Sequence, residues 1–454
     1  MDTETIYALS SGGGRAGVAV VRLSGVRAGA VLADLTGKSL PMPRKAVLRR
    51  LHDPASGLLL DQALVLYFPA PNSFTGEDVV ELHLHGGRAV VDGVLETLSS
   101  QPGCRLAEAG EFSRRAFEAG KLDLTEIEGL ADLINADTEM QRVQALRQLD
   151  GSLRRLYEDW RGRLMRHLAH LEADIDFPDE DLPDGVAGAV RPDIAALKRD
   201  VDTHLRDGRR GEAMRDGYRI VILGAPNAGK STLLNALARS DVAIVSDEAG
   251  TTRDVLDVPL DLSGYPVRLV DTAGLRTAGG KVEAEGIRRA VARAEEADLR
   301  LLLVRADAWP HVPDDVARWS GPNSLLVVSQ VDRIPVFHVE HESLPANIKP
   351  ETAGPLPVSA IGEGGLDVLL ETVGNTVSTA MALRDAPALT RARHREALID
   401  VTEHLARFDI NAGIDPVLAA EDVRQAARAL GRITGRVGVE DMLDLVFADF
   451  CIGK

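Results

Sequence analysis

Apolar residues in the middle of the chain fall into short continuous runs that are separated by stretches of helical spacing. The runs are residues 218–223, 265–270, 299–304, 324–329 and 356–359. Buried strands of a parallel sheet are apolar along most of their length, and the stretches between these runs suit crossover helices. The pattern therefore predicts an α/β domain in this part of the chain.

The residues on both sides of this domain follow a helical period instead. Apolar side chains recur every three or four positions over 153–175, which predicts one long amphipathic helix, and residues 125–149 show a similar face. Residues 416–433 and 440–450 return to the same period. Helical segments before and after an α/β unit predict an all-α helical domain interrupted by an inserted domain.

Residues 172–184 carry seven acidic residues and two prolines and no basic residue. This composition is typical of a solvated linker rather than a cation site.

The first 118 residues have a third kind of pattern. Short β-type runs at 17–23, 63–68 and 79–84 are joined by glycine-rich turns, and residues 88–98 have helical spacing. This mixture predicts an α+β module. The expected domains are residues 1–118, the helical domain at 119–215 and 379–454, and the inserted α/β domain at 216–378.

The charge balance restricts the partners of the chain. It has 454 residues, with 52 Lys and Arg against 69 Asp and Glu, and a net charge of −17. This balance disfavours non-specific nucleic-acid binding by the whole surface, although a local basic patch stays possible. Aromatic residues make up 4%, which argues against a stacking platform for single strands.

The sequence also predicts a cytoplasmic protein with no membrane segment. Its acidic N-terminus lacks the basic and apolar regions of a signal peptide, and no apolar run approaches the length that spans a bilayer. Cys104 and Cys451 are far apart and have no metal-binding spacing, so we expect reduced thiols.

Residues 224–231 read GAPNAGKS, a complete phosphate-binding loop (P-loop) between an apolar run and a helix. Gly224 and Gly229 let consecutive backbone N–H groups point at phosphate oxygens. Lys230 is expected to reach the β- and γ-phosphates, and Ser231 to offer its hydroxyl to Mg²⁺.

Two further motifs follow in the order found in P-loop GTPases of the Ras-like kind. Asp271–Gly274 reads DTAG, so Asp271 is expected to hold the water shell of Mg²⁺ and the Gly274 N–H to meet the γ-phosphate. Gly250–Asp254 reads GTTRD, in which Thr252 is the candidate to close on Mg²⁺ and Thr251 contributes backbone. Ras-like enzymes orient the attacking water with a Gln after such a glycine, whereas this chain has Leu275.

Guanine recognition usually relies on Asn-Lys-x-Asp, and this chain has Ser-Gln-Val-Asp at Ser329–Asp332. The Asp332 carboxylate can accept from both guanine donors, so a preference for guanine should persist. Ser359 and Ala360 are expected to supply a backbone N–H to the base. Because the Asn amide and the Lys stem are missing, we expect weakened nucleotide affinity.

The residues expected to contact GTP are Asn227, Ala228, Gly229, Lys230, Ser231, Thr232, Ser246, Glu248, Gly250, Thr251, Thr252, Asp271, Thr272, Ala273, Gly274, Asp332, Ser359 and Ala360. His83 and His85 share one face of a strand, but no third ligand with suitable spacing accompanies them, which favours polar contacts over a metal site.

Together these motifs resemble the tRNA modification GTPases of the MnmE (TrmE) family over nearly the whole chain. The matching segments are Phe74–Gly87, Gly110–Phe117, Gly120–Leu124, the P-loop, Gly250–Asp254, Asp271–Arg276 and Phe450–Lys454. The first three and the last are specific to that family, whereas the P-loop is shared with many GTPases.

The resemblance implies a GTP hydrolase, acting on an acid anhydride, that K⁺ activates. The implied K⁺ ligands are Asn227, Ser246, Glu248 and Thr251. A cation near the bridging oxygen would neutralise developing charge, and the implied water-orienting residue is Glu283, with Asp271 and Lys230 as the other catalytic residues. The resemblance also implies a homodimer.

The N-terminal module of this family binds a tetrahydrofolate derivative in its 5-formyl or methylene form and takes part in dimerisation. The implied ligands here are Arg22, Glu81, Lys121 and Lys454. Cys451 either faces that pocket as a reactive thiol or packs against the helical domain.

The implied function is modification of the wobble uridine of certain tRNAs at its 5-position, by a carboxymethylaminomethyl or aminomethyl group, together with an FAD-dependent MnmG-like partner. One rival is a regulatory GTPase of ribosome assembly that modifies nothing. Another, motivated by Ser329 and Gln330, is a degenerate switch that binds nucleotide weakly.

Overall fold

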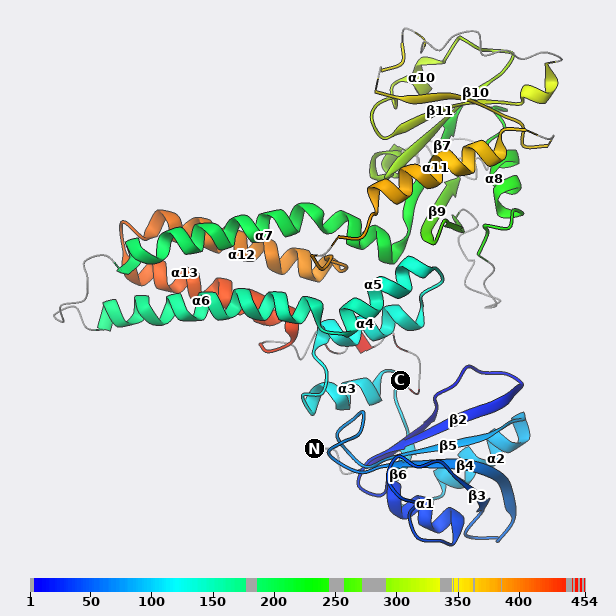
Figure 1. Ribbon diagram of the computed structural model, residues 1–454, viewed down its shortest axis with the longest axis vertical. Coiled ribbons are helices and arrows are strands. Elements are labelled where there is room, and N and C mark those ends of the chain that lie inside the picture. The colour runs from blue at the N-terminus through cyan, green and yellow to red at the C-terminus, as the bar shows by residue number, and fades with distance from the viewer. Residues whose placement is uncertain are drawn as a thin grey trace, which may run out of the picture. The chain divides into compact units, whose positions relative to one another are not determined.

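The computed structural model (Figure 1) describes residues 4–176, 186–244, 257–271, 291–334, 345, 347–349, 351–361, 364–384, 386–437, 443, 446–447, 450 and 453. The chain divides into two compact units. The first comprises Met1–Ala131, Gln148–Ala169 and Val423–Lys454, and the second comprises Asp132–Arg147 and His170–Asp422.

The first unit contains a six-stranded sheet in the order β3-β4-β5-β2-β1-β6. Its strands are β1 Thr5–Leu9, β2 Ala16–Ser24, β3 Val47–His52, β4 Leu59–Phe68, β5 Val79–Gly86 and β6 Cys104–Leu106, accompanied by helices α1 Ala28–Thr36, α2 Arg88–Ser99 and α3 Glu111–Glu118. Only the β1–β6 pair among these strands is parallel. Apolar residues of β2 and β5 pack with Leu32 of α1 and Leu98 of α2 in one core.

This arrangement confirms the expected α+β module. The strands predicted at 17–23, 63–68 and 79–84 and the helix predicted at 88–98 are present as β2, β4, β5 and α2. Strands β1, β3 and β6 and helices α1 and α3 were not predicted.

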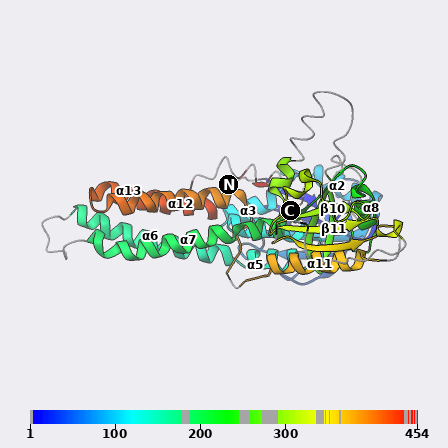
Figure 2. The ribbon, with the colours of Figure 1, turned by 90° about the horizontal axis from the view of Figure 1, so that it is seen from above.

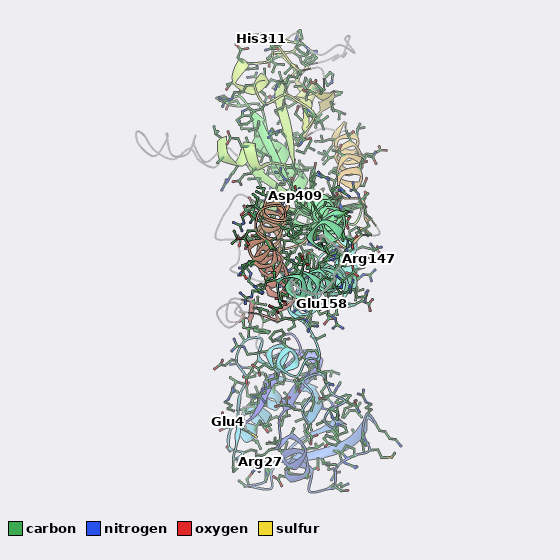
Figure 3. All side chains as sticks on the ribbon, turned by 90° about the vertical axis from the view of Figure 1, so that its left-hand side faces the viewer. Glu4, Arg27, Arg147, Glu158, His311 and Asp409 are labelled. Carbon is green, nitrogen blue, oxygen red and sulfur yellow. The ribbon has the colours of Figure 1, made fainter. Side chains whose placement is uncertain are left out.

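Along the chain, helices precede and follow the strands that lie between residues 218 and 358. They are α4 Leu124–Ile134, α5 Glu139–Leu149, α6 Ser152–Asp176, α7 Val186–Asp216, α12 Ala392–Asn411 and α13 Pro416–Thr434. The long helix predicted over 153–175 is confirmed as α6. In the first unit, Glu158 on α6 (Figure 3) accepts a hydrogen bond of 3.2 Å from the Thr434 hydroxyl at the end of α13.

Two details of these helical segments differ from the sequence-based expectation. Residues 125–149 form two helices rather than one, because Thr138 and Gln141 start a new helix at α5. The Thr138 N–H donates to Gln141 Oε1 at 3.1 Å and the Gln141 N–H donates to Thr138 Oγ1 at 3.4 Å, which is a capping box. Residues 172–176 of the expected linker continue α6, and residues 177–185 lie outside the described part of the chain.

In the second unit, α12 runs along α7 (Figures 1 and 2). Glycine allows the close approach at one end of this pair, because a Cβ atom on Gly211 of α7 would lie 2.0 Å from the Leu389 carbonyl oxygen. His204 of α7 and His394 of α12 are both buried. Burial and the nearby His394 lower the pKa of His204 to about 4.

The second unit also contains a six-stranded sheet in the order β12-β11-β10-β7-β9-β8. Its strands are β7 Tyr218–Gly224, β8 Asp257–Leu262, β9 Tyr265–Asp271, β10 Leu299–Arg305, β11 Ser324–Ser329 and β12 Ala353–Val358, and its helices are α8 Lys230–Ala238, α10 Asp314–Ala317 and α11 Leu366–Ala380, with a 3₁₀ turn η2 at Val331–Arg333. The predicted α/β pattern is confirmed. The expectation of parallel strands alone is incomplete, since β8 pairs with β9 in the antiparallel direction.

Both faces of this sheet are covered. Alternate residues of β7 enter two separate cores: Ile220 and Ile222 pack with α8 and α11, and Val221 packs with residues around α10. This explains why the strands read as continuous apolar runs. Within the described part of the chain, no helix combines the length and the apolar character needed to cross a membrane.

Candidate functional site

The P-loop connects the carboxyl end of β7 to the first residue of α8. A Cβ atom on Gly224 would lie 2.7 Å from the Leu303 carbonyl oxygen of the neighbouring strand, so a side chain there would collide with backbone. Gly229 has a φ of 90° and precedes α8, a left-handed conformation that glycine adopts readily. Asn227 adopts a φ of 64° without being glycine. Both positions therefore favour glycine, as the motif predicts.

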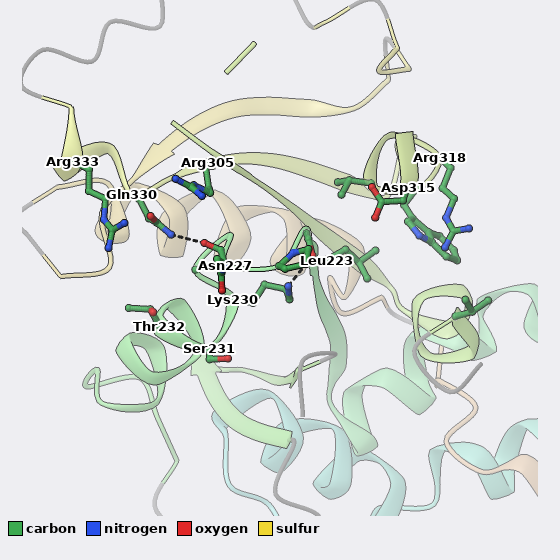
Figure 4. Close-up of a pocket in the computed structure, with 16 residues that line it drawn as sticks. Leu223, Asn227, Lys230, Ser231, Thr232, Arg305, Asp315, Arg318, Gln330 and Arg333 are labelled. Atoms are coloured by element: carbon green, nitrogen blue, oxygen red, sulfur yellow. Dashed lines mark hydrogen bonds between the residues drawn. The ribbon is translucent and has the colours of Figure 1, made fainter. Parts of the chain in front are cut away.

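The Lys230 ammonium group lies over the loop. Its Nζ atom donates to the carbonyl oxygen of Gly224 at 2.8 Å (Figure 4) and to that of Ala225 at 2.9 Å. These bonds hold the charge at the mouth of the P-loop, where phosphate oxygens would accept from it.

A cavity of about 870 Å³ opens over the P-loop. Its described lining includes Asn227, Gly229, Lys230, Ser231 and Thr232 from the loop and α8, and Arg305, Asp315, Arg318, Trp319, Gln330 and Arg333 from the other side (Figure 4). Four of these described side chains are cationic and Asp315 alone is acidic. In a chain with a net charge of −17, this local excess of positive charge suits a polyphosphate.

All of these elements meet at one edge of the sheet. The P-loop follows β7, Arg305 ends β10, Ser329 ends β11, and Asp271 ends β9, where it pairs with Ile222 of β7. Ligands of open parallel sheets bind at this carboxyl edge. Arg305 was not predicted as a site residue, although a charged residue at the end of a buried apolar strand is a signal that points to this edge.

The residues expected to recognise the base lie beside the P-loop. A smaller adjoining cavity is lined by Gly229 and Thr232 together with Asp332 and Ala360. The Ser359 hydroxyl donates to Asp332 Oδ1 at 2.7 Å, which orients the carboxylate. The structure thus brings the sequence-predicted Asp332, Ser359 and Ala360 together with the predicted phosphate loop.

Ser329 and Gln330 contact the P-loop directly. The Ser329 hydroxyl donates to the Ala228 carbonyl at 2.6 Å, and Gln330 Nε2 donates to the Asn227 carbonyl at 2.8 Å (Figure 4). The sequence had suggested only the loss of Asn and Lys side chains at these two positions. The replacements make contacts that the motif alone did not reveal.

Several predicted site residues lie outside the described residues. They are Ser246, Glu248, Gly250, Thr251, Thr252, Thr272, Ala273, Gly274, Glu283, Cys451 and Lys454. For Asp271 the structure describes the backbone, which ends β9.

In the first unit, Arg22 of β2 and Glu81 of β5 face each other across the sheet. Arg22 Nη2 lies 2.9 Å from Glu81 Oε1, and the guanidinium carbon lies 5.7 Å from the centre of the Phe74 ring and 5.8 Å from that of Phe112. The ammonium group of Lys121 donates to the Pro71 carbonyl at 2.6 Å. Two of the predicted folate ligands are therefore brought into direct contact.

The C-terminal segment also meets the N-terminal module within this unit. The Ser10 hydroxyl donates to the Gly453 carbonyl at 2.8 Å, and a Cβ atom on Gly453 would lie 2.2 Å from the Leu9 carbonyl oxygen. Leu9 pairs with Val21, the residue next to Arg22. Gly453 is thus held at the end of β1, next to the strand that carries Arg22.

Both strand histidines contact carboxylates. His85 Nδ1 lies 2.8 Å from Asp61 Oδ1, and His83 Nε2 lies 3.4 Å from Glu81 Oε2. Among the described residues, no group of three or more His, Cys, Asp or Glu side chains is placed to hold a metal ion.

Comparison with known proteins covers the whole chain. The family model of the GTP-binding protein TrmE N-terminus matches residues 5–121, and that of the MnmE helical domain matches residues 124–451. The FeoB G domain of Methanococcus jannaschii aligns with 36% of this chain and 98% of that chain at 23% identity, with a TM-score of 0.25. Because this score is low, the fold assignment rests on the strand order and not on that likeness.

Three curated relatives align with almost every residue. A tRNA modification GTPase MnmE of Parvibaculum lavamentivorans is 55% identical over 99% of this chain and 100% of its own length, and one of Paramagnetospirillum magneticum is 52% identical over 100% of both. A mitochondrial 5-taurinomethyluridine-[tRNA] synthase subunit of Homo sapiens is 49% identical over 99% of this chain and 93% of its own. This chain belongs to the MnmE family of tRNA modification GTPases.

Proposed function

We propose that this chain is a K⁺-dependent GTP hydrolase whose reaction drives modification of the wobble uridine of certain tRNAs at the 5-position. GTP hydrolysis tied to tRNA modification is the activity of the family to which the chain belongs. The observation that carries the proposal is the meeting of Lys230 and the Ser359–Asp332 pair at one edge of one sheet. That edge offers cations to phosphates and an oriented carboxylate to a base with two adjacent donors.

Different residues of this chain would have different roles in hydrolysis. Lys230 would bind the β- and γ-phosphates, and Ser231, Thr252 and Asp271 would hold Mg²⁺ directly or through water. Glu283 would orient the attacking water, a role that Leu275 cannot perform. Asn227, Ser246, Glu248 and Thr251 would hold K⁺, which supplies positive charge near the bridging oxygen of the nucleotide when it is bound.

The described part of the proposed K⁺ site has suitable chemistry. Asn227 lines the main cavity next to the phosphate loop, and an amide oxygen is a ligand that hard cations accept. Its backbone carbonyl accepts a hydrogen bond from Gln330 at 2.8 Å, and the side-chain amide oxygen is the group proposed to bind K⁺.

We expect GTP hydrolysis to be at least about tenfold faster in K⁺ than in Na⁺ at equal ionic strength, and ATP hydrolysis to be slow in both. The physical reason is the loss of a correctly placed charge in the transition state, for which a tenfold change corresponds to about 1.4 kcal/mol. Phosphate release from GTP and ATP would be measured side by side in the two salts. Equal and negligible GTP rates in both salts would identify a degenerate switch instead.

The first unit would hold a tetrahydrofolate derivative, in its 5-formyl or methylene form, as the one-carbon donor. Arg22 contacts Glu81, its guanidinium carbon lies within 5.8 Å of the centres of two aromatic rings, and Lys121 would add a second cation for the glutamyl tail. The contact of Gly453 with Leu9 and Ser10 supports a role for its neighbour Lys454 in closing this site. Cys451 would either face this site as a reactive thiol or pack against the helical domain.

The proposal includes a division of labour among domains and partners. Residues 1–118 would bind folate and dimerise, 119–215 and 379–454 would form the helical domain, and 216–378 would form the GTPase domain. The active assembly would be a cytoplasmic homodimer joined by an FAD-dependent MnmG-like partner. Since the chain has a net charge of −17, that partner would carry most of the contact with tRNA.

Nucleoside analysis of tRNA separates this proposal from a ribosome-assembly GTPase. In a strain that lacks this chain, we expect the carboxymethylaminomethyl or aminomethyl group to be absent from wobble uridines and to return with the wild-type gene. Arg22→Ala should fail to restore it while GTP hydrolysis by the purified variant stays within about twofold of wild type, because Arg22 lies in the other unit. Unchanged wobble uridines in the deletion strain would contradict the tRNA assignment.

A further inference from the structure

We propose that Gln330 is a positioning residue that fixes the backbone of the P-loop from the base-recognition turn. Its Nε2 atom donates to the Asn227 carbonyl at 2.8 Å (Figure 4). The role in nucleotide affinity stands on this geometry, and only an added effect on K⁺ activation rests on the proposed function.

Two residues other than glycine in the left-handed backbone conformation meet at this bond. Gln330 has a φ of 60° and a ψ of 36°, and Asn227 has a φ of 64°. For Gln330 this left-handed conformation costs about 1 kcal/mol or more, whereas asparagine adopts it more readily, and such conformations persist where surrounding contacts over-determine them. Among the described residues, only Arg44 and Ser263 share this non-glycine conformation. One hydrogen bond joins two of these four residues within the nucleotide cavity. This indicates that the contact holds the backbone of both residues in place.

The hydrogen bond fixes a peptide unit of the P-loop. A peptide unit is planar and trans, so fixing the Asn227 carbonyl also fixes the N–H of Ala228 on the opposite side, which donates to the Ala225 carbonyl at 3.2 Å within the loop. The Ser329 hydroxyl does the same for the next peptide, because it holds the Ala228 carbonyl at 2.6 Å and thereby orients the N–H of Gly229. Two consecutive peptide units of the loop are therefore held from residues 329 and 330.

Close packing leaves this arrangement little freedom. A Cβ atom on Gly229 would lie 3.3 Å from Gln330 Nε2, so the Gln amide lies against the loop at its glycine. Gln330 is half-buried, and Arg333 at the end of the same turn also lines the cavity. Because the turn also carries Asp332, contact of a base with Asp332 would stabilise the same bond that orders the phosphate loop. Base recognition and phosphate binding are thus coupled through one side chain.

The decisive experiment is a set of substitutions at 330 in the full chain. Gln330→Met keeps the length and neutrality of the side chain but removes the donor, and Gln330→Lys keeps a donor of similar reach. Gln330→Gly removes the donor and relieves the backbone strain. Gln141→Met is the matched control, because Gln141 Nε2 makes a similar bond of 3.0 Å to the Arg215 carbonyl and does not line the nucleotide cavity.

The readout is the dissociation constant of a fluorescent GDP in Na⁺, where neither hydrolysis nor K⁺ contributes. We expect Gln330→Met and Gln330→Gly to weaken GDP binding roughly three- to tenfold, the range for loss of one hydrogen bond. Gln330→Lys and Gln141→Met should stay within about twofold of wild type. The KM for GTP should rise in parallel, with a smaller change in kcat, and thermal unfolding would verify that each variant is folded.

Three results would overturn the assignment. Wild-type GDP affinity in a folded Gln330→Met variant would show that the bond is irrelevant. Full affinity in Gln330→Gly would attribute the role to backbone conformation alone, and a Lys variant no better than the Met variant would exclude the donor as the cause. A K⁺ titration of GTP hydrolysis completes the set, because wild-type rates that do not respond to K⁺ would refute the proposed K⁺ site while the GDP measurement still decides the role of Gln330.

Discussion

Lys230→Ala is expected to lower the rate of GTP hydrolysis by about a thousandfold or more. The ammonium group is held at the mouth of the P-loop by the carbonyls of Gly224 and Ala225. It is the cation on the loop itself, and a single preorganised donor at developing charge is worth about 10²–10³ in kcat. Loss of the charge in addition to the hydrogen bond places the expected effect at the upper end. Phosphate release at saturating GTP measures it.

Lys198→Ala is the matched control for this substitution. Lys198 lies on α7 in the same unit and pairs with Asp202 at 2.8 Å, outside the described lining of the nucleotide cavity. Its removal should leave hydrolysis within about twofold, since a partly exposed pair away from the nucleotide cavity contributes little to stability. A folded Lys230→Ala variant that retains more than about a tenth of the wild-type rate would contradict the phosphate-binding role.

Asp332→Asn is expected to weaken GTP binding by at least about a hundredfold and to improve binding of xanthosine triphosphate. The carboxylate accepts two N–H groups from guanine, and a hydrogen bond to a charged acceptor is worth about 1.5–3 kcal/mol. The Asn amide presents a donor where guanine also has one, whereas xanthine offers a carbonyl oxygen at that position. Competition of each triphosphate against a fluorescent GDP gives both affinities.

Two further variants test whether the effect of Asp332→Asn on nucleotide binding is specific to base recognition. Asp367→Asn in the first turn of α11 changes the same kind of side chain outside the described lining of the base cavity and should not alter base preference. Ser359→Ala should weaken GTP binding a few-fold, because its hydroxyl orients Asp332 at 2.7 Å. Unchanged preference for guanine in Asp332→Asn would place base recognition elsewhere.

The parts of the fold that were predictable have a strong apolar period. The buried strands β7, β10 and β11 are apolar along most of their length. The long helix α6 keeps apolar residues at helical spacing from end to end. Strand β8 was missed because Asp257–Leu262 alternates between polar and apolar residues and contains Pro259 at the sheet edge. The break between α4 and α5 falls in the mostly polar stretch between Ile134 and Met140, and the local sign that marks the new helix is the capping pair Thr138 and Gln141.

The site was predictable where its residues are contiguous. Gly224–Ser231 form a continuous motif whose spacing alone implies phosphate binding. The contact of Gln330 with Asn227 joins positions 103 residues apart, and no local pattern encodes it. The expected weakness of the Ser-Gln-Val-Asp turn followed from comparing side chains one by one, whereas the structure shows Ser329 and Gln330 bonded to the loop that binds phosphate.

The pairing of α7 with α12 also determines the order of folding during synthesis, because α7 can pair only after α12 has been made. About 175 residues separate the end of α7 from the start of α12, and at roughly 5–20 residues per second a ribosome takes about 9–35 s to make them. During that interval α12 is not available to pack on α7, whose buried apolar residues include Ile194, Leu197 and Val201. All six strands of the nucleotide-binding sheet emerge within the same interval, so the sheet can be complete before its flanking helix pair closes.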